Sequence, residues 1–217
     1  MARLKVGVLM SGRGSNLQAL LVVCADPGFP AEIALVISNK PGVQGLARAR
    51  AAGVRTVVIN HRGFAGKEAF EAALDATLRD AGTELVCLAG FMRLLTARFV
   101  ESWRDRLINI HPSLLPAFKG LDTHARVLEA GVRFTGCTVH YVRPAMDEGP
   151  IIVQAVVPVL PDDDAHSLAA RVLAVEHHCY PLALKLIAEG RTQVVDERVV
   201  IEGVAPLDIP TLVNPQE

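Results

Sequence analysis

The sequence predicts an α/β protein with a doubly wound, mostly parallel sheet and a mixed C-terminal portion. Short apolar runs rich in Val, Ile and Leu alternate with Ala-rich amphipathic segments along the first half of the chain. The apolar runs show no polar alternation, which is typical of parallel strands buried on both faces. The repeated strand–helix order favours right-handed crossovers between neighbouring parallel strands.

In the first half, the pattern predicts strands at residues 4–10, 32–38, 56–60, 85–89 and 107–110. Helices are expected between them, at residues 16–25, 43–52, 67–80 and 96–103. The rhythm changes after Ile110, where residues 111–121 contain two prolines and a glycine and are expected to form a long loop. A short helix at 122–130, capped by Asp122 or Thr123, should follow that loop.

The last third of the chain predicts two strands, at 134–142 and 151–159, on either side of a turn at 144–150. A helix at 164–189 carries an apolar stripe and should be kinked by Pro181. A hairpin is expected from strands 194–196 and 199–201 around Glu197-Arg198. No linker or repeat divides the chain, so we expect one folding unit at 1–203, with lobes at about 1–105 and 106–203 and a loose tail at 204–217.

Composition excludes several classes of protein. With 51% hydrophobic and 21% charged residues, the chain of 217 residues is neither disordered nor collagen-like. A formal net charge of −1 argues against binding of nucleic acid through its phosphates. Four widely spaced cysteines favour reduced thiols over disulfides or a zinc site. No apolar run approaches the roughly 18 residues of a membrane span. We therefore expect a cytoplasmic protein without a membrane partner, as a monomer or a homodimer.

The segment Ser11-Gly12-Arg13-Gly14-Ser15-Asn16 follows a predicted strand and opens a predicted helix. Backbone N–H groups at such a turn, together with the helix dipole, form a site for an anion. Leu17 stands where a dinucleotide-binding loop has its third glycine, and no acidic residue ends the second strand. The loop thus favours a small phosphate monoester over NAD, although a tight turn alone would also require its glycines.

Asn109 and His111 lie two residues apart at the end of a predicted strand, so their side chains should point to the same side. An amide N–H can stabilise a developing oxyanion, and an imidazole can transfer a proton. Asp147, in a later turn, could orient and charge the ring of His111. Two blander interpretations stay open, namely a polar strand end and an ordinary solvated turn. His140 is expected to be a structural histidine bonded to the backbone.

Seven motifs in these segments occur in order from about residue 5 to residue 190: SGRGSNLQAL, AGFMRLL, INIHPSLLP, THARVLEAG, GCTVHYV, MDEGPII and RVLAVEHHCYP. In these motifs the chain resembles the folate-dependent formyltransferases. The SGRGSN motif is similar to that of the branch acting on glycinamide ribonucleotide. The resemblance implies a Rossmann-like formyltransferase fold whose N-terminal lobe binds phosphate and whose C-terminal lobe carries the folate and catalytic groups.

The resemblance also implies roles for individual residues. Asn109, His111 and Asp147 match the catalytic trio of the family. The substrate-binding positions are Gly14, Ser15 and Asn16, for the 5′-phosphate, and Glu176, for the rest of the ribonucleotide. The folate-binding positions are Lys67, Met92, Arg93, Leu94, Leu95, Val100, Asn109, Val142 and Arg143. The sequence departs from the family at Leu173, where a Lys or Gln often reaches the phosphate, and at Lys67, which replaces a frequent arginine.

The activity implied is transfer of a formyl group from 10-formyltetrahydrofolate to the amine of 5′-phosphoribosylglycinamide, a step of de novo purine biosynthesis. The amine would attack the formyl carbon directly, and no metal is expected. His177-His178-Cys179 is not expected to bind one, because neighbouring side chains on a helix diverge by roughly 100°. The main alternative is 10-formyltetrahydrofolate hydrolase, whose relatives carry an extra N-terminal domain. Methionyl-tRNA formyltransferase is disfavoured, since it has a further C-terminal domain for tRNA that we do not expect here and since the chain lacks a basic balance. A non-catalytic nucleotide-binding domain that uses only the glycine loop is the remaining alternative.

Overall fold

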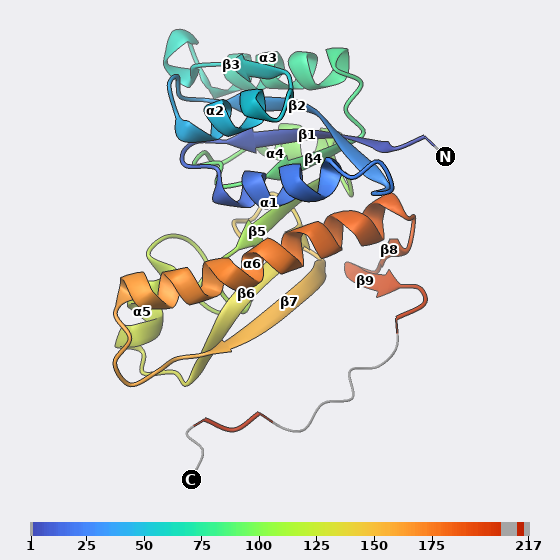
Figure 1. Ribbon diagram of the computed structural model, residues 1–217. Coiled ribbons are helices and arrows are strands. Elements are labelled where there is room, and N and C mark those ends of the chain that lie inside the picture. Colours follow the sequence, from blue (N-terminus) through green and yellow to red (C-terminus); the bar gives the residue numbers. More distant parts are fainter. Residues whose placement is uncertain (1, 205–211, 215–217) are drawn as a thin grey trace.

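A seven-stranded sheet in the order β3-β2-β1-β4-β5-β6-β7 organises the chain (Figure 1). The computed structural model describes residues 2–204 and 212–214. Most of the tail expected at 204–217 therefore lies outside the described residues.

The first five strands of the sheet are parallel, as predicted. They are β1 (Leu4–Met10), β2 (Ala31–Ser38), β3 (Thr56–Val58), β4 (Leu85–Leu88) and β5 (Leu107–His111). The helices between them are α1 (Ser15–Cys24), α2 (Gln44–Ala51), α3 (Lys67–Asp80) and α4 (Ala97–Ser102), with a short 3₁₀ turn η1 (His61–Gly63) before α3. From β1, the chain continues to β2 and β3 on one side of β1, whereas β4 pairs with β1 on the other side. This change of direction creates a switch point between β1 and β4.

The remaining strands of the sheet, β6 (Phe134–Tyr141) and β7 (Ile151–Pro158), are antiparallel to their neighbours, which confirms the mixed C-terminal portion. The register of β5 on β6 sets Asn109 opposite His140 and His111 opposite Thr138. Helix α5 (Thr123–Glu129) precedes β6, and the long helix α6 (Ala165–Ala188) follows β7. A separate hairpin of β8 (Thr192–Val195) and β9 (Arg198–Ile201) follows α6.

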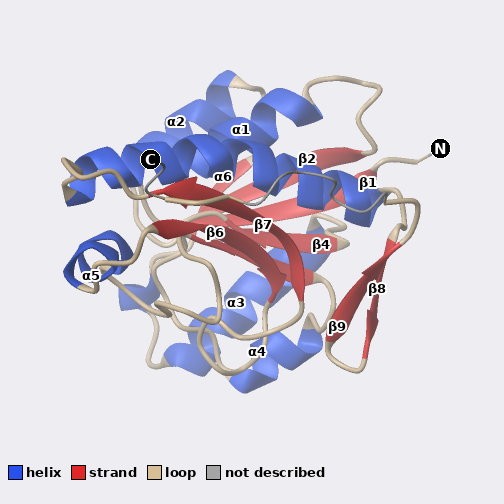
Figure 2. Cartoon of the chain, turned by 90° about the horizontal axis from the view of Figure 1, so that it is seen from below, coloured by secondary structure: helices blue, strands red, loops and turns tan. Residues whose placement is uncertain are grey.

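Helices cover both faces of the sheet, with α1, α2 and α6 on one face and α3 and α4 on the other (Figure 2). Each face has its own apolar cluster. One contains Leu17 and Leu20 of α1 with Val172 of α6, and the other contains Leu74 of α3 with Trp103. These side chains are fully buried. The parallel strands are apolar on both faces because each face is covered, which explains why their sequences do not alternate.

Three local expectations need correction or comment. Asp122 precedes α5 in the left-handed region (φ 54°) and makes no capping hydrogen bond with its side chain, so the cap predicted there is wrong. The final turn is centred on Asp196 and Glu197, one residue earlier than predicted, because both adopt the positive φ of a two-residue hairpin turn. Helix α6 continues through Pro181 to Ala188, and the kink expected at Pro181 stays a prediction.

Candidate active site

The carboxyl ends of the central parallel strands bring the predicted site residues to one edge of the sheet. Ser11–Asn16 follow β1, Lys40 follows β2, Ala89–Leu95 follow β4, and His111 ends β5. The switch point between β1 and β4 lies in the middle of this edge. In sheets of this kind, ligands bind at the carboxyl edge beside the switch point.

The glycine loop lines a cavity of about 360 Å³ at this edge. Gly14 takes the left-handed conformation (φ 72°) directly before the first residue of α1, a conformation that glycine adopts with little strain. The N-terminal N–H groups of a helix have no acceptor within the helix and favour an anion. The residues around the cavity include all three predicted phosphate-binding positions and are Ser11, Gly12, Arg13, Gly14, Ser15, Asn16, Lys40, Ala89, Gly90 and Met92.

Glu176 of α6 joins the glycine loop although it lies 160 residues away in the sequence. The amide Nδ2 of Asn16 donates to Glu176 Oε2 at 2.9 Å. Burial raises the pKa of the Glu176 carboxyl, and the hydrogen bond from Asn16 partly opposes that rise. Within the described residues, the buried Oδ1 of Asn16 has no hydrogen-bond partner, so it can accept from a ligand. Two predicted substrate-binding residues are thus hydrogen-bonded to each other.

Lys40 is a functional candidate that the sequence analysis did not identify. It is exposed and lines the same cavity as the glycine loop, as does Arg13. The signal was present, since Lys40 comes two residues after the end of β2, whose neighbour β1 leads into the glycine loop. Its ammonium group supplies a positive charge beside the cavity, whereas the apolar Leu173 supplies none.

His111 and Asp147, which the resemblance placed together, lie in contact. The distance between His111 Nδ1 and Asp147 Oδ2 is 3.4 Å, and both side chains are largely buried. Asp147 takes a left-handed conformation (φ 50°), and its Oδ2 also accepts from the backbone N–H of Gly120 at 2.7 Å. The carboxylate therefore links the histidine to the loop that follows β5.

The second nitrogen of His111, Nε2, lies 2.9 Å from the carbonyl oxygen of Phe118. The ring is thus held between two oxygens, one from Asp147 and one from the loop. An imidazolium can donate to both oxygens, whereas a neutral imidazole has only one N–H. The carbonyl oxygen of Phe118 therefore takes up the Nε2 side of the ring.

Asn109 contacts His140, its partner across the sheet. The distance between Asn109 Nδ2 and His140 Nε2 is 3.4 Å, and His140 Nδ1 lies 2.9 Å from the carbonyl oxygen of Tyr141. Burial lowers the pKa of His140, so its ring is neutral and carries its proton on Nδ1. Its Nε2 then accepts from the Asn109 amide and orients it. The backbone bond expected of His140 is present, and the contact with Asn109 is an addition.

The predicted folate-binding residues fall into two groups. Leu95, Val100 and Val142 pack in the apolar cluster beneath α3 and α4. Met92 and Leu94 expose about two thirds of their surface (64% and 66%), as an apolar binding surface would. The exposed Lys67 begins α3, and Arg93 is exposed beside Met92.

Arg143 is committed to another contact. Its Nε donates to Glu197 at 2.6 Å and its Nη2 to Asp105 at 2.8 Å. The ion pair with Glu197 attaches the β8–β9 hairpin to the main sheet. The guanidinium is therefore engaged away from a ligand, and only the backbone of Arg143 is available to bind one.

Three further features of the described residues concern metal ligands, membrane-spanning helices and the cysteines. Among residues 2–204 and 212–214, no group of three or more His, Cys, Asp or Glu is arranged to hold a metal ion. In the same part of the chain, no helix has both the length and the apolar character needed to cross a membrane. The four cysteines are free and buried, and burial raises the pKa of the Cys24 thiol to about 11.

The profile of the formyl transferase family matches residues 4–184, so the chain belongs to the formyl transferase family. It is 51% identical over 197 residues to the trifunctional purine biosynthetic protein adenosine-3 of Drosophila melanogaster. That match covers 90% of this chain but only 15% of the length of the trifunctional protein.

Relatives of similar length point to a particular branch of the family. The phosphoribosylglycinamide formyltransferase of Haemophilus influenzae is 39% identical, with 93% of this chain and 95% of that protein covered. The structure of glycinamide ribonucleotide transformylase 1 from Symbiobacterium toebii superposes with a TM-score of 0.90 at 47% identity, covering 92% and 94% of the two chains. A formyltetrahydrofolate deformylase from Pseudomonas syringae is more distant, with a TM-score of 0.85, 26% identity and coverage of 92% and 66%.

Proposed function

We propose that this protein transfers the formyl group of 10-formyltetrahydrofolate to the amine of 5′-phosphoribosylglycinamide, in de novo purine biosynthesis. The observation that carries the proposal is the contact of His111 with Asp147 at the carboxyl end of β5, two residues after Asn109 and at the same edge of the sheet as the glycine loop. The names of the relatives that match most of their own length agree with this reaction. In this proposal, residues 1–203 form a single formyltransferase domain.

The substrate spans the site from the glycine loop to the catalytic trio. Its phosphate lies against Gly14, Ser15 and Asn16, with Lys40 supplying positive charge. Its glycinamide portion lies near Glu176, which places the amine toward β5. The pterin of the folate packs on the apolar residues that follow β4, and backbone groups near Val142 and Arg143 bind its polar edge. The formyl carbon then lies between Asn109 and His111.

The reaction forms one C–N bond and breaks another. The amine lone pair attacks the formyl carbon, and the carbonyl oxygen becomes an oxyanion that accepts from Asn109 and the imidazolium of His111. Collapse of this intermediate breaks the bond to folate N10. The proton lost by the amine moves to that nitrogen, through water held by Asp147. These bond and proton transfers require neither a covalent nucleophile nor a metal ion.

Donation from His111 to the oxyanion requires movement of the loop at residues 112–121. The Nε2 of His111 now faces the carbonyl of Phe118, so that carbonyl has to leave before a substrate oxygen can take its place. Gly120 is bound to Asp147, and Lys119 is paired with Glu148 at 2.6 Å, so the loop is held at several points. We expect both substrates together to change the protease sensitivity of this loop.

One assay separates this function from the hydrolase and from a non-catalytic domain. The protein is mixed with 10-formyltetrahydrofolate, and formation of tetrahydrofolate is followed with and without glycinamide ribonucleotide. Turnover only with the ribonucleotide supports the transferase. Equal turnover without it identifies the hydrolase, the function of the more distant structural relative. Absence of turnover under both conditions supports a non-catalytic nucleotide-binding domain.

The location and assembly of the protein are part of the same proposal. We place it in the cytoplasm, where its thiols stay reduced, because all four cysteines are free. It acts as a monomer or a homodimer, and sedimentation at assay concentration distinguishes the two.

A further inference from the structure

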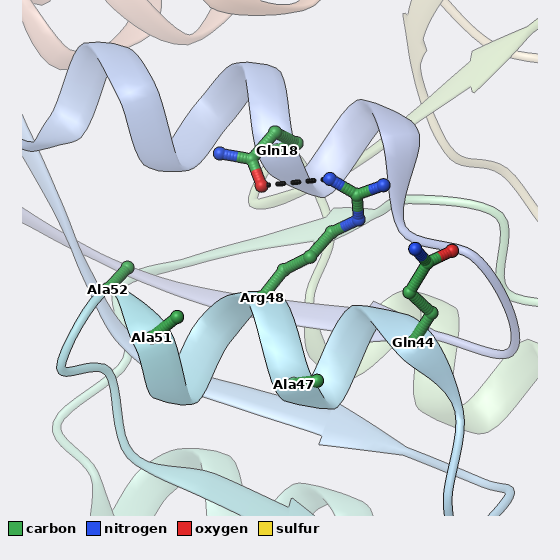
Figure 3. A pocket seen from close by; sticks show the side chains of 6 residues that line it. All are labelled: Gln18, Gln44, Ala47, Arg48, Ala51 and Ala52. Carbon is green, nitrogen blue, oxygen red and sulfur yellow. Dashed lines mark hydrogen bonds between the residues drawn. The ribbon is translucent and has the colours of Figure 1, made fainter.

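The backbone of the glycine loop is held in place by α2. The N–H of Gly45 donates to the carbonyl oxygen of Gly12 at 3.2 Å, and Arg48 Nε donates to that of Arg13 at 3.1 Å. Arg48 also donates from Nη1 to Gln18 Oε1 of α1 at 3.1 Å. Figure 3 shows the Arg48 side chain extending from α2 toward Gln18. A single guanidinium thus joins the loop, α1 and α2.

These contacts determine where the N–H groups of the loop point. In a trans peptide, the carbonyl of one residue and the N–H of the next point in opposite directions. Because Gly45 and Arg48 hold the carbonyls of Gly12 and Arg13, the N–H groups of Arg13 and Gly14 are directed away from α2. No hydrogen bond among the described residues uses either of these two N–H groups. They therefore remain available to an anion in the cavity that the loop lines.

Close packing keeps α2 against the loop. A Cβ atom on Gly45 would lie 2.1 Å from Met10 Cε, and one on Gly14 would lie 2.7 Å from Gly45 Cα. A Cβ atom on Gly45 would also lie 3.3 Å from the carbonyl oxygen of Gly12, so glycine at this position favours the close approach of α2 to the loop. Gly45 is buried, whereas Arg48 is partly exposed at a groove of about 460 Å³ between α1 and α2.

Arg48 itself does not line the phosphate cavity, and the two lined surfaces share no residue. We propose that Arg48 is a positioning residue for phosphate binding, which it supports by fixing the carbonyl of Arg13 and so the direction of the Gly14 N–H. This inference rests on the proposed function, because it assigns the anion to the phosphate of the ribonucleotide. The inference gives a role in phosphate binding to a residue that does not itself line the binding surface.

Steady-state kinetics of Arg48→Ala test the proposal, with Arg50→Ala as the matched control. Arg50 lies on the same helix, is exposed and donates to Thr56 rather than to the loop. Arg48→Ala should raise KM for glycinamide ribonucleotide about tenfold, the effect of one charge-assisted hydrogen bond, with kcat unchanged. KM for 10-formyltetrahydrofolate should stay at its wild-type value, and Arg50→Ala should match the wild type throughout.

Two comparisons separate positioning from a general effect. Glycinamide riboside, which lacks the phosphate, should react equally well with the wild type and with Arg48→Ala. An equal loss with both acceptors would overturn the proposal. Arg48→Lys keeps the charge, but an ammonium lacks the planar fork that reaches Arg13 and Gln18 together, so its KM should also rise. A wild-type KM in Arg48→Lys would show that charge alone suffices, and the positioning role would then be wrong.

Binding of inorganic phosphate gives a readout that does not depend on turnover. Phosphate should raise the melting temperature of the wild type and of Arg50→Ala, and should raise that of Arg48→Ala less at the same concentration. Equal stabilisation of all three proteins would contradict the positioning role. If the wild type transfers no formyl group to glycinamide ribonucleotide, the proposed function fails, while the phosphate comparison still decides the role of Arg48.

Discussion

Replacement of Gly14 by alanine should destabilise the protein through two separate effects. Gly14 has φ 72°, and an alanine held in this left-handed region loses about 1–2 kcal/mol. Its Cβ would lie 2.7 Å from Gly45 Cα, a backbone atom that cannot rotate away. Overpacking of this kind adds about 1–3 kcal/mol. The free energy of unfolding should therefore fall by about 2–5 kcal/mol, which corresponds to a melting temperature lower by roughly 10 °C in a chain of this size.

Two other glycines serve as controls for the separate effects. Gly42 has φ 68° but open space around a Cβ atom, so Gly42→Ala should lose only the conformational part, about 1–2 kcal/mol. Gly12 lies in the same loop as Gly14, has open space and no positive φ, so Gly12→Ala should change stability by less than about 0.5 kcal/mol. Thermal and urea unfolding of the three variants measure these differences. Equal losses in Gly14→Ala and Gly42→Ala would refute the close approach of α2 to the loop.

Three further predictions concern the site. Asn109→Ala and His111→Ala should each lower kcat about 10²–10³-fold, since each removes one oxyanion donor, and wild-type turnover in either would remove that residue from the mechanism. Lys40→Ala should raise KM for glycinamide ribonucleotide about tenfold but leave the phosphate-free riboside unaffected, and a loss with both acceptors would argue against a phosphate contact. Glu176→Gln should raise the melting temperature at neutral pH and weaken binding of the ribonucleotide. Burial raises the pKa of Glu176, so its ionised form destabilises the folded state. That destabilisation is absent below the ordinary pKa of a glutamate and complete above the folded one. The gain should therefore disappear near pH 4, and a gain independent of pH would have another cause.

The sequence predicted those parts of the site that follow from chain order. Ser15 and His111 each come at or after the end of a parallel strand, and parallel strands in one sheet end at one edge. Spacing within a strand likewise predicted that Asn109 and His111 share a side. The position of Asp147 followed from the resemblance rather than from spacing, and the distance of 3.4 Å to His111 agrees with it.

Contacts that depend on register or on distant segments were not predictable in the same way. The contact between Asn109 and His140 requires the pairing of β5 with β6, which a shift by one residue would abolish. Arg143 was assigned to the folate, but its guanidinium pairs with Glu197, 54 residues later in a hairpin outside the main sheet. No local pattern distinguishes an arginine that binds a ligand from one that attaches a hairpin.

The two ligand-binding regions of the edge are also connected to each other. Ser11 Oγ accepts from the backbone N–H of Met92 at 2.9 Å and donates to Asn39 Oδ1 at 2.6 Å. Ser11 begins the glycine loop proposed for the phosphate, and Met92 lies in the apolar segment proposed for the folate. The buried Ser11 hydroxyl therefore links the two segments by a hydrogen bond. Movement of one segment therefore strains a hydrogen bond of the other. On the opposite side, Arg48 holds the same loop from α2. The glycine loop is thus hydrogen-bonded on both sides, whereas the carbonyl oxygen of Phe118 faces His111 Nε2. In the proposed function, we therefore expect the phosphate to bind to a preformed loop, and the catalytic groups to assemble only when the loop after β5 moves.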